Sequence, residues 1–125
     1  MNIALISLGS NMPLGEENIL ESIKQILEKA ESGRFSSVYD TEPEGIHRHA
    51  KYKNCVGEIF TPLSYEEWEL FFKDLEIRLG RTPELRMQGN VPIDIDIIIW
   101  NREVLRPKDL SMEYVKEGLR SLNGD

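Results

Sequence analysis

Apolar and polar positions alternate along the first half of the chain with two different periods, and each period indicates one kind of element. Residues 2–8 form a short apolar run that ends at the glycine-containing turn 9–11, which predicts a buried strand. Over residues 15–30 apolar side chains recur every three or four positions, which predicts an amphipathic helix that Ser32 and Gly33 stop. Residues 35–41 and 52–61 have the alternation expected of two further strands.

The second half repeats this order. Ser64 and Glu67 have the spacing of a capping box, which predicts a helix that begins there and runs to about Leu79. A loop with two prolines and a glycine follows, and residues 92–100 (PIDIDIIIW) are then the most strand-like run of the chain. Residues 110–122 are predicted as a last helix.

The predicted order is β-α-β, β-α-β and a final helix. Four strands with two helices on one face favour an α+β fold, a ferredoxin-like sandwich with a four-stranded antiparallel sheet. A different four-stranded α+β layer remains the alternative, because periodicity does not fix the order of strands in a sheet. No linker or repeat divides the sequence, so we expect one domain over residues 1–125.

Composition narrows the class of protein. The 125 residues are 40% hydrophobic and carry a formal net charge of -7, which makes nucleic acid an unexpected partner. Cys55 is the single cysteine, which excludes an internal disulfide and fits a cytoplasmic location. No apolar run is long enough to cross a membrane, and no membrane association is expected.

Two aspartates interrupt the last predicted strand. Asp94 and Asp96 are two positions apart, so both project to one face of the sheet while the intervening isoleucines face the other. Two carboxylates this close repel each other, and Mg²⁺, which prefers oxygen ligands and keeps several waters, compensates such a pair. Arg81 and Arg86 in the preceding loop add the cations that polyphosphate chemistry requires. The alternative is a pair of solvated acids that protect an exposed sheet face.

Four short blocks, in this order, resemble one known family. They are SLGSN at 7–11, YDTEPEG at 39–45 with YKN at 52–54, LGR at 79–81 and IDIDI at 93–97. The ordered set resembles the 6-hydroxymethyl-7,8-dihydropterin pyrophosphokinase (HPPK) family of folate biosynthesis. The resemblance implies a ferredoxin-like fold and transfer of pyrophosphate from MgATP to the hydroxymethyl group of the reduced pterin.

The resemblance also implies roles for individual residues. Asp94 and Asp96 would hold two Mg²⁺ ions that bridge the ATP phosphates and the attacking hydroxyl, with Arg81 as a third catalytic residue. The pterin would be bound by residues of the second and third predicted strands and the loop between them: Thr41, Pro43, Gly45, Tyr52 and Asn54. The nucleotide would be bound by Glu76, Arg81 and Ile97, with Arg86 nearby.

The loop at 80–92 departs from the family pattern. Pro83 and Val91 stand where the resemblance leads us to expect arginines, and Gln88 stands in place of a tryptophan. The segment after residue 100 also lacks the family's proline-histidine segment and final strand. Four basic residues are candidates to replace the missing phosphate contacts: Arg86, Arg102, Arg106 and Lys108.

The sequence therefore predicts an ATP-dependent pyrophosphokinase with reduced or altered activity, whose partners are ATP and a reduced pterin and whose oligomeric state is open. A second hypothesis remains. A degenerate family member would bind a pterin or nucleotide without catalysis, or would serve as an interaction module.

Overall fold

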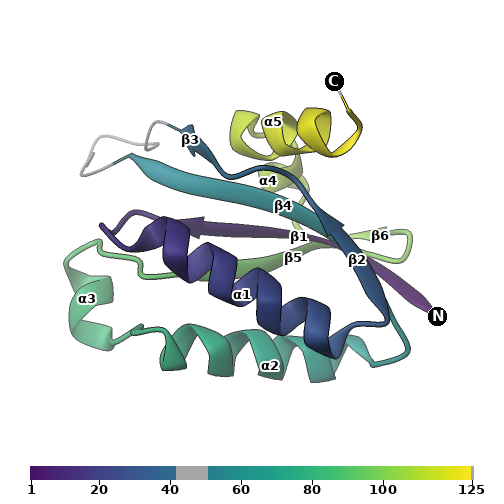
Figure 1. Cartoon of the computed structure of the whole chain (residues 1–125), viewed down its shortest axis with the longest axis horizontal. Coiled ribbons are helices and arrows are strands. Elements are labelled where there is room, and N and C mark those ends of the chain that lie inside the picture. The colour runs from purple at the N-terminus through teal and green to yellow at the C-terminus, as the bar shows by residue number, and fades with distance from the viewer. Residues whose placement is uncertain (42–50, 125) are drawn as a thin grey trace.

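The strand that begins the chain lies in the middle of the sheet. The computed structural model describes residues 1–41 and 51–124. Its elements are, in chain order, β1 (Asn2–Ser10), α1 (Gly15–Lys29), β2 (Ser32–Phe35), β3 (Tyr39–Thr41), β4 (Tyr52–Thr61), α2 (Tyr65–Arg78), α3 (Pro83–Met87), β5 (Asp94–Trp100), β6 (Glu103–Val104), α4 (Pro107–Leu110) and α5 (Glu113–Leu122). The strands pair in the order β2-β4-β1-β5-β6, β3 also pairs with β4, and every pairing is antiparallel (Figure 1).

The α+β class and the ferredoxin-like arrangement are confirmed, but the sheet has six strands and not four. One addition arises because the predicted strand 35–41 is not continuous: β2 ends at Phe35, residues 36–38 are not in a strand, and β3 begins at Tyr39 on the same edge of β4. Three residues of this edge lie opposite two residues of β4, as in a β-bulge. The hydroxyl of Ser36 accepts a 3.0 Å hydrogen bond from the Val56 N–H at this irregularity. With β2 and β3 taken as one interrupted strand, the four long strands have the ferredoxin-like order.

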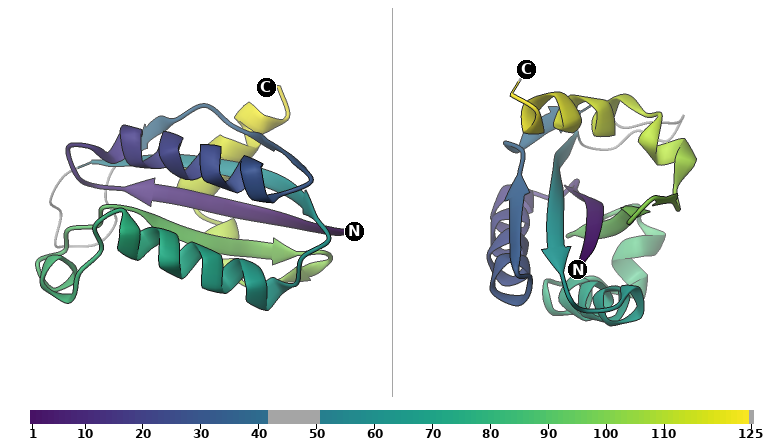
Figure 2. Two further views of the ribbon diagram at one scale, coloured as in Figure 1. Left: turned by 60° about the horizontal axis from the view of Figure 1, so that its bottom comes forward. Right: turned by 90° about the vertical axis from the view of Figure 1, so that its right-hand side faces the viewer.

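One face of the sheet packs on α1 and α2 and forms the main core (Figures 1 and 2). The aromatic rings of Trp68 and Phe72 from α2 lie there, as the periodicity predicts. The Ser64 hydroxyl and the Glu67 side chain form the predicted capping box at the start of α2. Helix α1 ends at Lys29, so the prediction that Ser32 and Gly33 stop it was wrong, and these residues begin β2.

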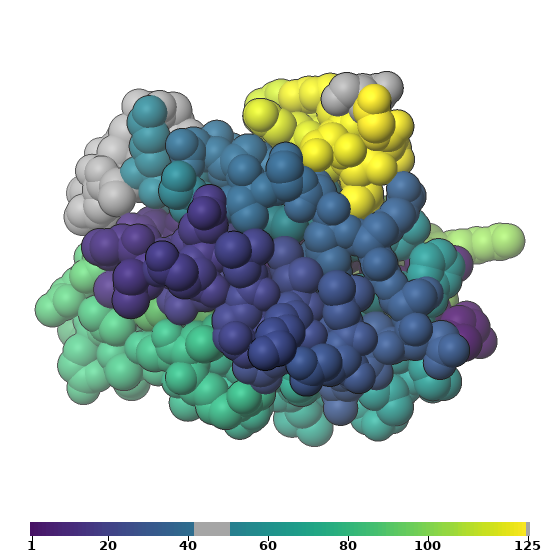
Figure 3. Space-filling model, in the orientation of Figure 1, coloured from purple at the N-terminus to yellow at the C-terminus, as the bar shows by residue number. Residues whose placement is uncertain are grey.

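The opposite face of the sheet is partly covered by α4 and α5, which come from the C-terminal segment (Figure 2). Most of the predicted helix 110–122 is confirmed as α5, which begins at Glu113, and the short helix α4 precedes it; both lie on the other side of the sheet from α1 and α2. Helix α5 approaches β4 closely at Gly118, where an added Cβ would lie 2.5 Å from a carbon of Val56. Figure 3 shows α5 as a ridge on the upper side of the molecule, with α1 across the front and α2 below it.

The predicted loop 81–92 contains the short helix α3. The Thr82 hydroxyl accepts a hydrogen bond from the Leu85 N–H, and Pro83 occupies the first turn, where a missing N–H is tolerated. Gly80, with φ of 117°, separates α2 from this segment as the sequence predicts. None of the helices in the described part of the chain is long and apolar enough to cross a membrane.

Candidate active site

The strand β5 places its two aspartates as the alternation predicts. Ile95 and Ile97 are buried in the core beneath α1 and α2, whereas Asp94 and Asp96 project from the other face. Their partners on the neighbouring strand β1 are small, since Gly9 pairs with Asp94 and Ser7 pairs with Asp96. The small partners leave open space above the two carboxylates.

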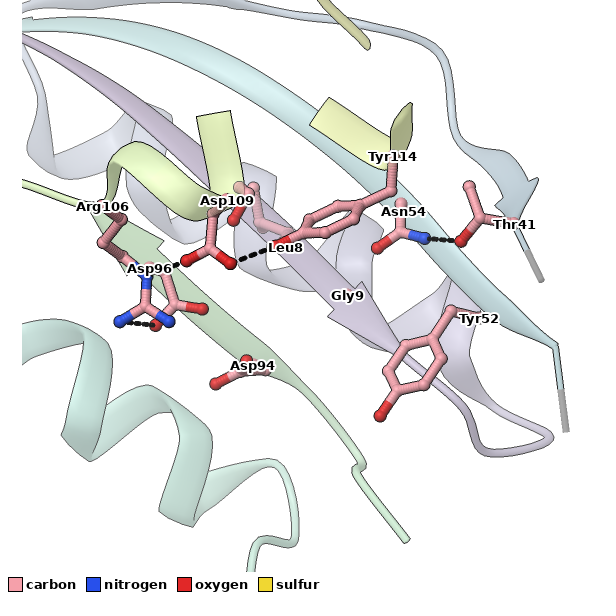
Figure 4. A pocket seen from close by; sticks show the side chains of 11 residues that line it. Leu8, Gly9, Thr41, Tyr52, Asn54, Asp94, Asp96, Arg106, Asp109 and Tyr114 are labelled. Carbon is pink, nitrogen blue, oxygen red and sulfur yellow. Dashed lines mark hydrogen bonds and ion pairs between the residues drawn. The ribbon is translucent and has the colours of Figure 1, made fainter. Parts of the chain in front are cut away.

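That space is a cavity of about 300 Å³ between the sheet and the C-terminal helices (Figure 4). Its volume is at the lower end of the range for small-molecule sites. Residues from β1, β3, β4, β5, α4 and α5 and the residue before α4 line it: Ser7, Leu8, Gly9, Thr41, Tyr52, Asn54, Asp94, Asp96, Arg106, Asp109 and Tyr114. The cavity therefore joins residues that are up to 107 positions apart in the sequence.

The two aspartates create an unfavourable charge pair. Burial, together with the negative charge of Asp94, raises the pKa of Asp96 to about 7, and Arg106 opposes this shift only in part. The Arg106 Nη1 atom lies 3.9 Å from Asp96 Oδ1, which is too long for a direct hydrogen bond. A group that supplies further positive charge would favour the ionised form of the pair.

The carboxylate oxygens of Asp94 and Asp96 are the kind of ligand that Mg²⁺ prefers. Among residues 1–41 and 51–124, no group of three or more histidine, cysteine, aspartate or glutamate side chains could hold a metal by itself. Mg²⁺ does not need such a group, because it is commonly bound by one or two carboxylates, waters and substrate phosphates. The pair Asp94 and Asp96 fits this pattern, since both side chains line one cavity.

The buried Glu76 and the half-buried Arg81 form a support beside the cavity. The Glu76 carboxylate is only 5% exposed; it accepts a 2.8 Å hydrogen bond from the Ile95 N–H and a 2.6 Å bond from Arg81 Nη1. Burial raises the pKa of Glu76, while these two hydrogen bonds favour its ionised form. The same Arg81 nitrogen lies 3.9 Å from Asp94 Oδ1. Glu76 thus fixes both the main chain of β5 and the guanidinium next to Asp94.

A polar group from β3 and β4 forms the other wall of the cavity. The buried Asn54 side chain donates through Nδ2 to the Thr41 hydroxyl, and its Oδ1 atom faces β1. Any side chain at position 9 would collide here, because a Cβ on Gly9 would lie 2.9 Å from Asn54 Oδ1. Tyr52 lies on the same side, and partial burial and the charge of Asp94 raise its pKa.

The structure brings most of the predicted site residues together, but not all of them. Thr41, Tyr52, Asn54, Asp94 and Asp96 line the main cavity. A smaller cavity of about 120 Å³, which shares Asp94, is lined by the two predicted arginines and the end of the loop: Arg81, Arg86, Asn90, Val91, Pro92 and Asp94. Pro43 and Gly45, both predicted to contact the pterin, lie outside the described residues.

Two residues predicted near the nucleotide line neither cavity. The Ile97 side chain is only 3% exposed and belongs to the core on the opposite face of β5. Glu76 acts through its contacts with Arg81 and β5 and is not on the wall of either cavity. Of the four basic candidates from the sequence, Arg106 reaches the main cavity and Arg86 the smaller one, whereas Arg102 and Lys108 are exposed and line neither.

Sequence reasoning missed Asp109 and Tyr114. The Arg106 Nε atom donates to Asp109, and the Tyr114 hydroxyl donates a 2.8 Å hydrogen bond to the other oxygen of the same carboxylate. The only signal in the sequence was the three-residue spacing of Arg106 and Asp109, which permits an ion pair on one helical turn. The spacing gave no indication that α4 would lie over the aspartates of β5.

The SLGSN block has a second role besides its turn. The Asn11 side chain donates a 2.8 Å bond to the Gly89 carbonyl and accepts a 2.7 Å bond from the Val91 N–H. The Ser10 hydroxyl donates to the Val91 carbonyl at 3.0 Å, and outside the block the Asn18 side chain of α1 adds a 2.9 Å bond to the Pro92 carbonyl. These bonds fix the segment that leads into Asp94, a function that a tight turn alone does not predict.

Comparison with known proteins identifies the relatives of this chain. The profile of the 7,8-dihydro-6-hydroxymethylpterin-pyrophosphokinase (HPPK) family matches residues 5–124. The 2-amino-4-hydroxy-6-hydroxymethyldihydropteridine pyrophosphokinase of Bacillus subtilis (strain 168) is 34% identical over 115 residues, which cover 90% of this chain and 68% of the relative. The protein of the same name from Aquifex aeolicus (strain VF5) is 31% identical over 114 residues, or 91% of this chain and 71% of the relative. The folic acid synthesis protein FOL1 of Dictyostelium discoideum is 29% identical over 113 residues, which cover 90% of this chain and 17% of that protein. The chain belongs to the HPPK family.

Proposed function

We propose that this protein transfers pyrophosphate from MgATP to 6-hydroxymethyl-7,8-dihydropterin in folate biosynthesis. The observation that carries the proposal is the position of Asp94 and Asp96 in one cavity, between the polar group around Asn54 and the guanidinium of Arg81. Family membership supports the same reaction. A non-catalytic role is not favoured, since the two acidic residues that such chemistry needs are retained and face the cavity.

The reaction forms one bond and breaks one bond at phosphorus. The hydroxymethyl oxygen of the pterin bonds to the β-phosphorus of ATP, and the bond from that phosphorus to the oxygen bridging the α-phosphate breaks. The electron pair leaves with AMP, and the hydroxyl proton passes to solvent. Such a transfer depends on alignment and on neutralisation of phosphate charge more than on a strong base.

Asp94 and Asp96 would hold Mg²⁺, and the family resemblance leads us to propose two ions. Bound there, the metal supplies positive charge to the phosphate oxygens. The protein itself would fix the two carboxylates, because β5 buries Ile95 and Ile97 in the core on its other face. Glu76 would hold β5 at Ile95, directly between the two aspartates, and would keep Arg81 in reach of the nucleotide.

The pterin would lie against β3 and β4. Asn54 and Thr41 offer an amide and a hydroxyl in one corner of the cavity, which suit the amide and amine edge of a pterin ring. Tyr52 would line the ring from the side. Pro43 and Gly45 are proposed to complete this binding region on the basis of the family resemblance.

The nucleotide would extend from the aspartates toward the smaller cavity. Arg81 is held by Glu76, whereas no described residue engages the guanidinium of Arg86. Arg86 therefore has its donors available for a phosphate oxygen. Ile97 would contribute only through its main chain, because its side chain is in the core.

The test is to incubate the protein with MgATP and the reduced pterin and to measure AMP by chromatography. We expect AMP from the wild type and none above background from Asp96→Ala, while Asp74→Ala, an exposed position on α2, retains turnover. Absence of AMP from the wild type, with pterin binding intact in calorimetry, would contradict the proposed reaction. Unchanged turnover in Asp96→Ala would contradict the role of the aspartate pair.

A further inference from the structure

We propose that Arg106 contacts the phosphoryl group in transfer and that Asp109 is its positioning residue. This inference rests on the proposed function and extends it to Arg106, which the sequence indicates only as one of four candidates to replace missing phosphate contacts. Arg106 directly precedes α4, Asp109 is in α4 and Tyr114 is in α5. All three line the main cavity with Asp94 and Asp96 (Figure 4).

Asp109 orients the guanidinium of Arg106. Its Nε atom donates to Asp109, while its Nη1 atom lies 3.9 Å from Asp96 Oδ1. The distance of 3.9 Å to Asp96 is too long for a hydrogen bond, so the terminal nitrogens of Arg106 keep N–H donors for another acceptor. The Arg106 side chain is 48% exposed, and Figure 4 shows its terminal nitrogens on the side of Asp96. A phosphate oxygen near Asp96 would meet these donors.

Asp109 is itself fixed from α5. The Tyr114 hydroxyl donates a 2.8 Å bond to Asp109 Oδ1, which leaves the other carboxylate oxygen for Arg106. The main chain of Tyr114 is tied to the sheet, because its carbonyl accepts a hydrogen bond from the Tyr39 hydroxyl. The chain of contacts from β3 through α5 to Arg106 holds the guanidinium in place before a substrate binds, which is the condition for efficient charge stabilisation.

The charges around the aspartates support the same assignment. Arg81 lies 3.9 Å from Asp94, and Arg106 lies 3.9 Å from Asp96, so one guanidinium stands beside each carboxylate. Val91, where the family resemblance leads us to expect an arginine, supplies no charge. Arg106 enters from the opposite side of the cavity and provides the second cation that a transferred pyrophosphate requires.

The first test compares Arg106→Ala, Arg106→Lys and the control Arg102→Ala, which removes an exposed arginine four positions earlier. We expect Arg106→Ala to lower kcat by about 10²-fold, the usual effect of losing one positioned donor. We expect pterin affinity and the melting temperature to stay near the wild-type values. Arg106→Lys should lose less activity, free guanidinium ion should partly restore Arg106→Ala, and Arg102→Ala should match the wild type. A kcat for Arg106→Ala within twofold of the wild type would overturn the inference.

A binding measurement separates this inference from the proposed reaction. The probe is the Mg²⁺ complex of an ATP analogue with a methylene group between the α- and β-phosphorus, titrated by calorimetry. We expect Arg106→Ala to weaken its binding about tenfold, as for the loss of one charged hydrogen bond. Equal affinity in wild type and variant would overturn the role of Arg106. Failure of the wild type to release AMP would contradict only the reaction.

The role of Asp109 has its own test. Asp109→Asn keeps the shape of the side chain but removes the charge that orients Arg106, so we expect kcat to fall about tenfold with little change in the KM for the pterin. Tyr114→Phe removes only the hydroxyl that fixes Asp109 and should have a smaller effect in the same direction. In the Arg106→Ala background, Asp109→Asn should cause little further loss of kcat. An additive loss in the double variant would overturn the positioning role.

Discussion

Replacing Asp96 by asparagine should make the metal-free protein more stable while it abolishes turnover. In the folded protein, burial and the neighbouring Asp94 raise the pKa of Asp96 from 3.8 to about 7. In the unfolded chain both effects are lost. Between these two pKa values the folded state holds a proton that the unfolded state has released, so rising pH favours unfolding. Asparagine removes this penalty because it does not ionise.

The magnitude follows from the size of the shift. About three pKa units, at about 1.4 kcal/mol for each unit, give a ceiling of roughly 4 kcal/mol at pH 8. Asp96 is 27% exposed, so screening by solvent reduces this figure. We expect Asp96→Asn to raise the free energy of unfolding by about 1–2 kcal/mol at pH 8. The gain should shrink toward zero as the pH falls through 7 to about 4.

The assay is urea denaturation in EDTA at pH 4.5, 6 and 8, with Asp74→Asn as the control. Asp74 is an exposed aspartate paired with Arg78 on α2, and its substitution should not stabilise the protein at any of these pH values. Mg²⁺ should then raise the stability of the wild type but not of Asp96→Asn, because we propose that the folded wild type binds it through Asp96. A variant that is no more stable than the wild type at pH 8, or equally stabilised at all three pH values, would refute the reasoning.

Three further substitutions test the supports of the site, each by urea denaturation. Glu76→Ala should cost about 2–3 kcal/mol, since it leaves the buried Ile95 N–H without its acceptor, whereas Asp74→Ala on the same helix should cost under about 0.5 kcal/mol. Asn11→Ala should cost about 1–2 kcal/mol and lower turnover, because two hydrogen bonds to the segment before β5 are lost; unchanged turnover would show that this segment is held by other contacts. Gly118→Ala should cost about 1–3 kcal/mol, as its methyl group would lie 2.5 Å from a buried valine carbon, and full stability would mean that α5 can shift outward.

The parts of the site that depend on local pattern could be predicted from the sequence. In a strand the side chains alternate, so the isoleucines of β5 fix by themselves that Asp94 and Asp96 face away from the main core. The capping box at Ser64 and Glu67 is equally local, and it is confirmed. Helix α3 was predictable in principle from Thr82 and Pro83, but the glycine and prolines around it favoured a loop.

The parts that depend on tertiary packing could not be predicted. Nothing in the periodicity of residues 107–122 indicates that α4 and α5 cover the second face of the sheet and not the first. This placement depends on tertiary contacts such as the close approach of Gly118 to β4 and the hydrogen bond from the Tyr39 hydroxyl to the Tyr114 carbonyl. Because α4 lies there, Arg106 becomes a residue of the cavity, whereas Arg102, four positions earlier, remains on the surface.

The placement of α4 and α5 over the sheet explains both the destabilising effect of ionised Asp96 on the metal-free protein and the position of Arg106. Helices α4 and α5 contribute Asp109 and Tyr114 to the cavity that Asp96 lines, and burial is the largest cause of the raised pKa of Asp96. Each aspartate has a guanidinium 3.9 Å away, a distance that leaves the negative charge only partly compensated. A divalent cation would neutralise the remaining negative charge of the two aspartates. A phosphate oxygen could then accept hydrogen bonds from the N–H groups of Arg106 that have no other acceptor among the described residues. A cavity with fully paired aspartates would be more stable, but it would bind Mg²⁺ and polyphosphate less well. We therefore expect variants that stabilise the metal-free protein at this position to lose affinity for MgATP.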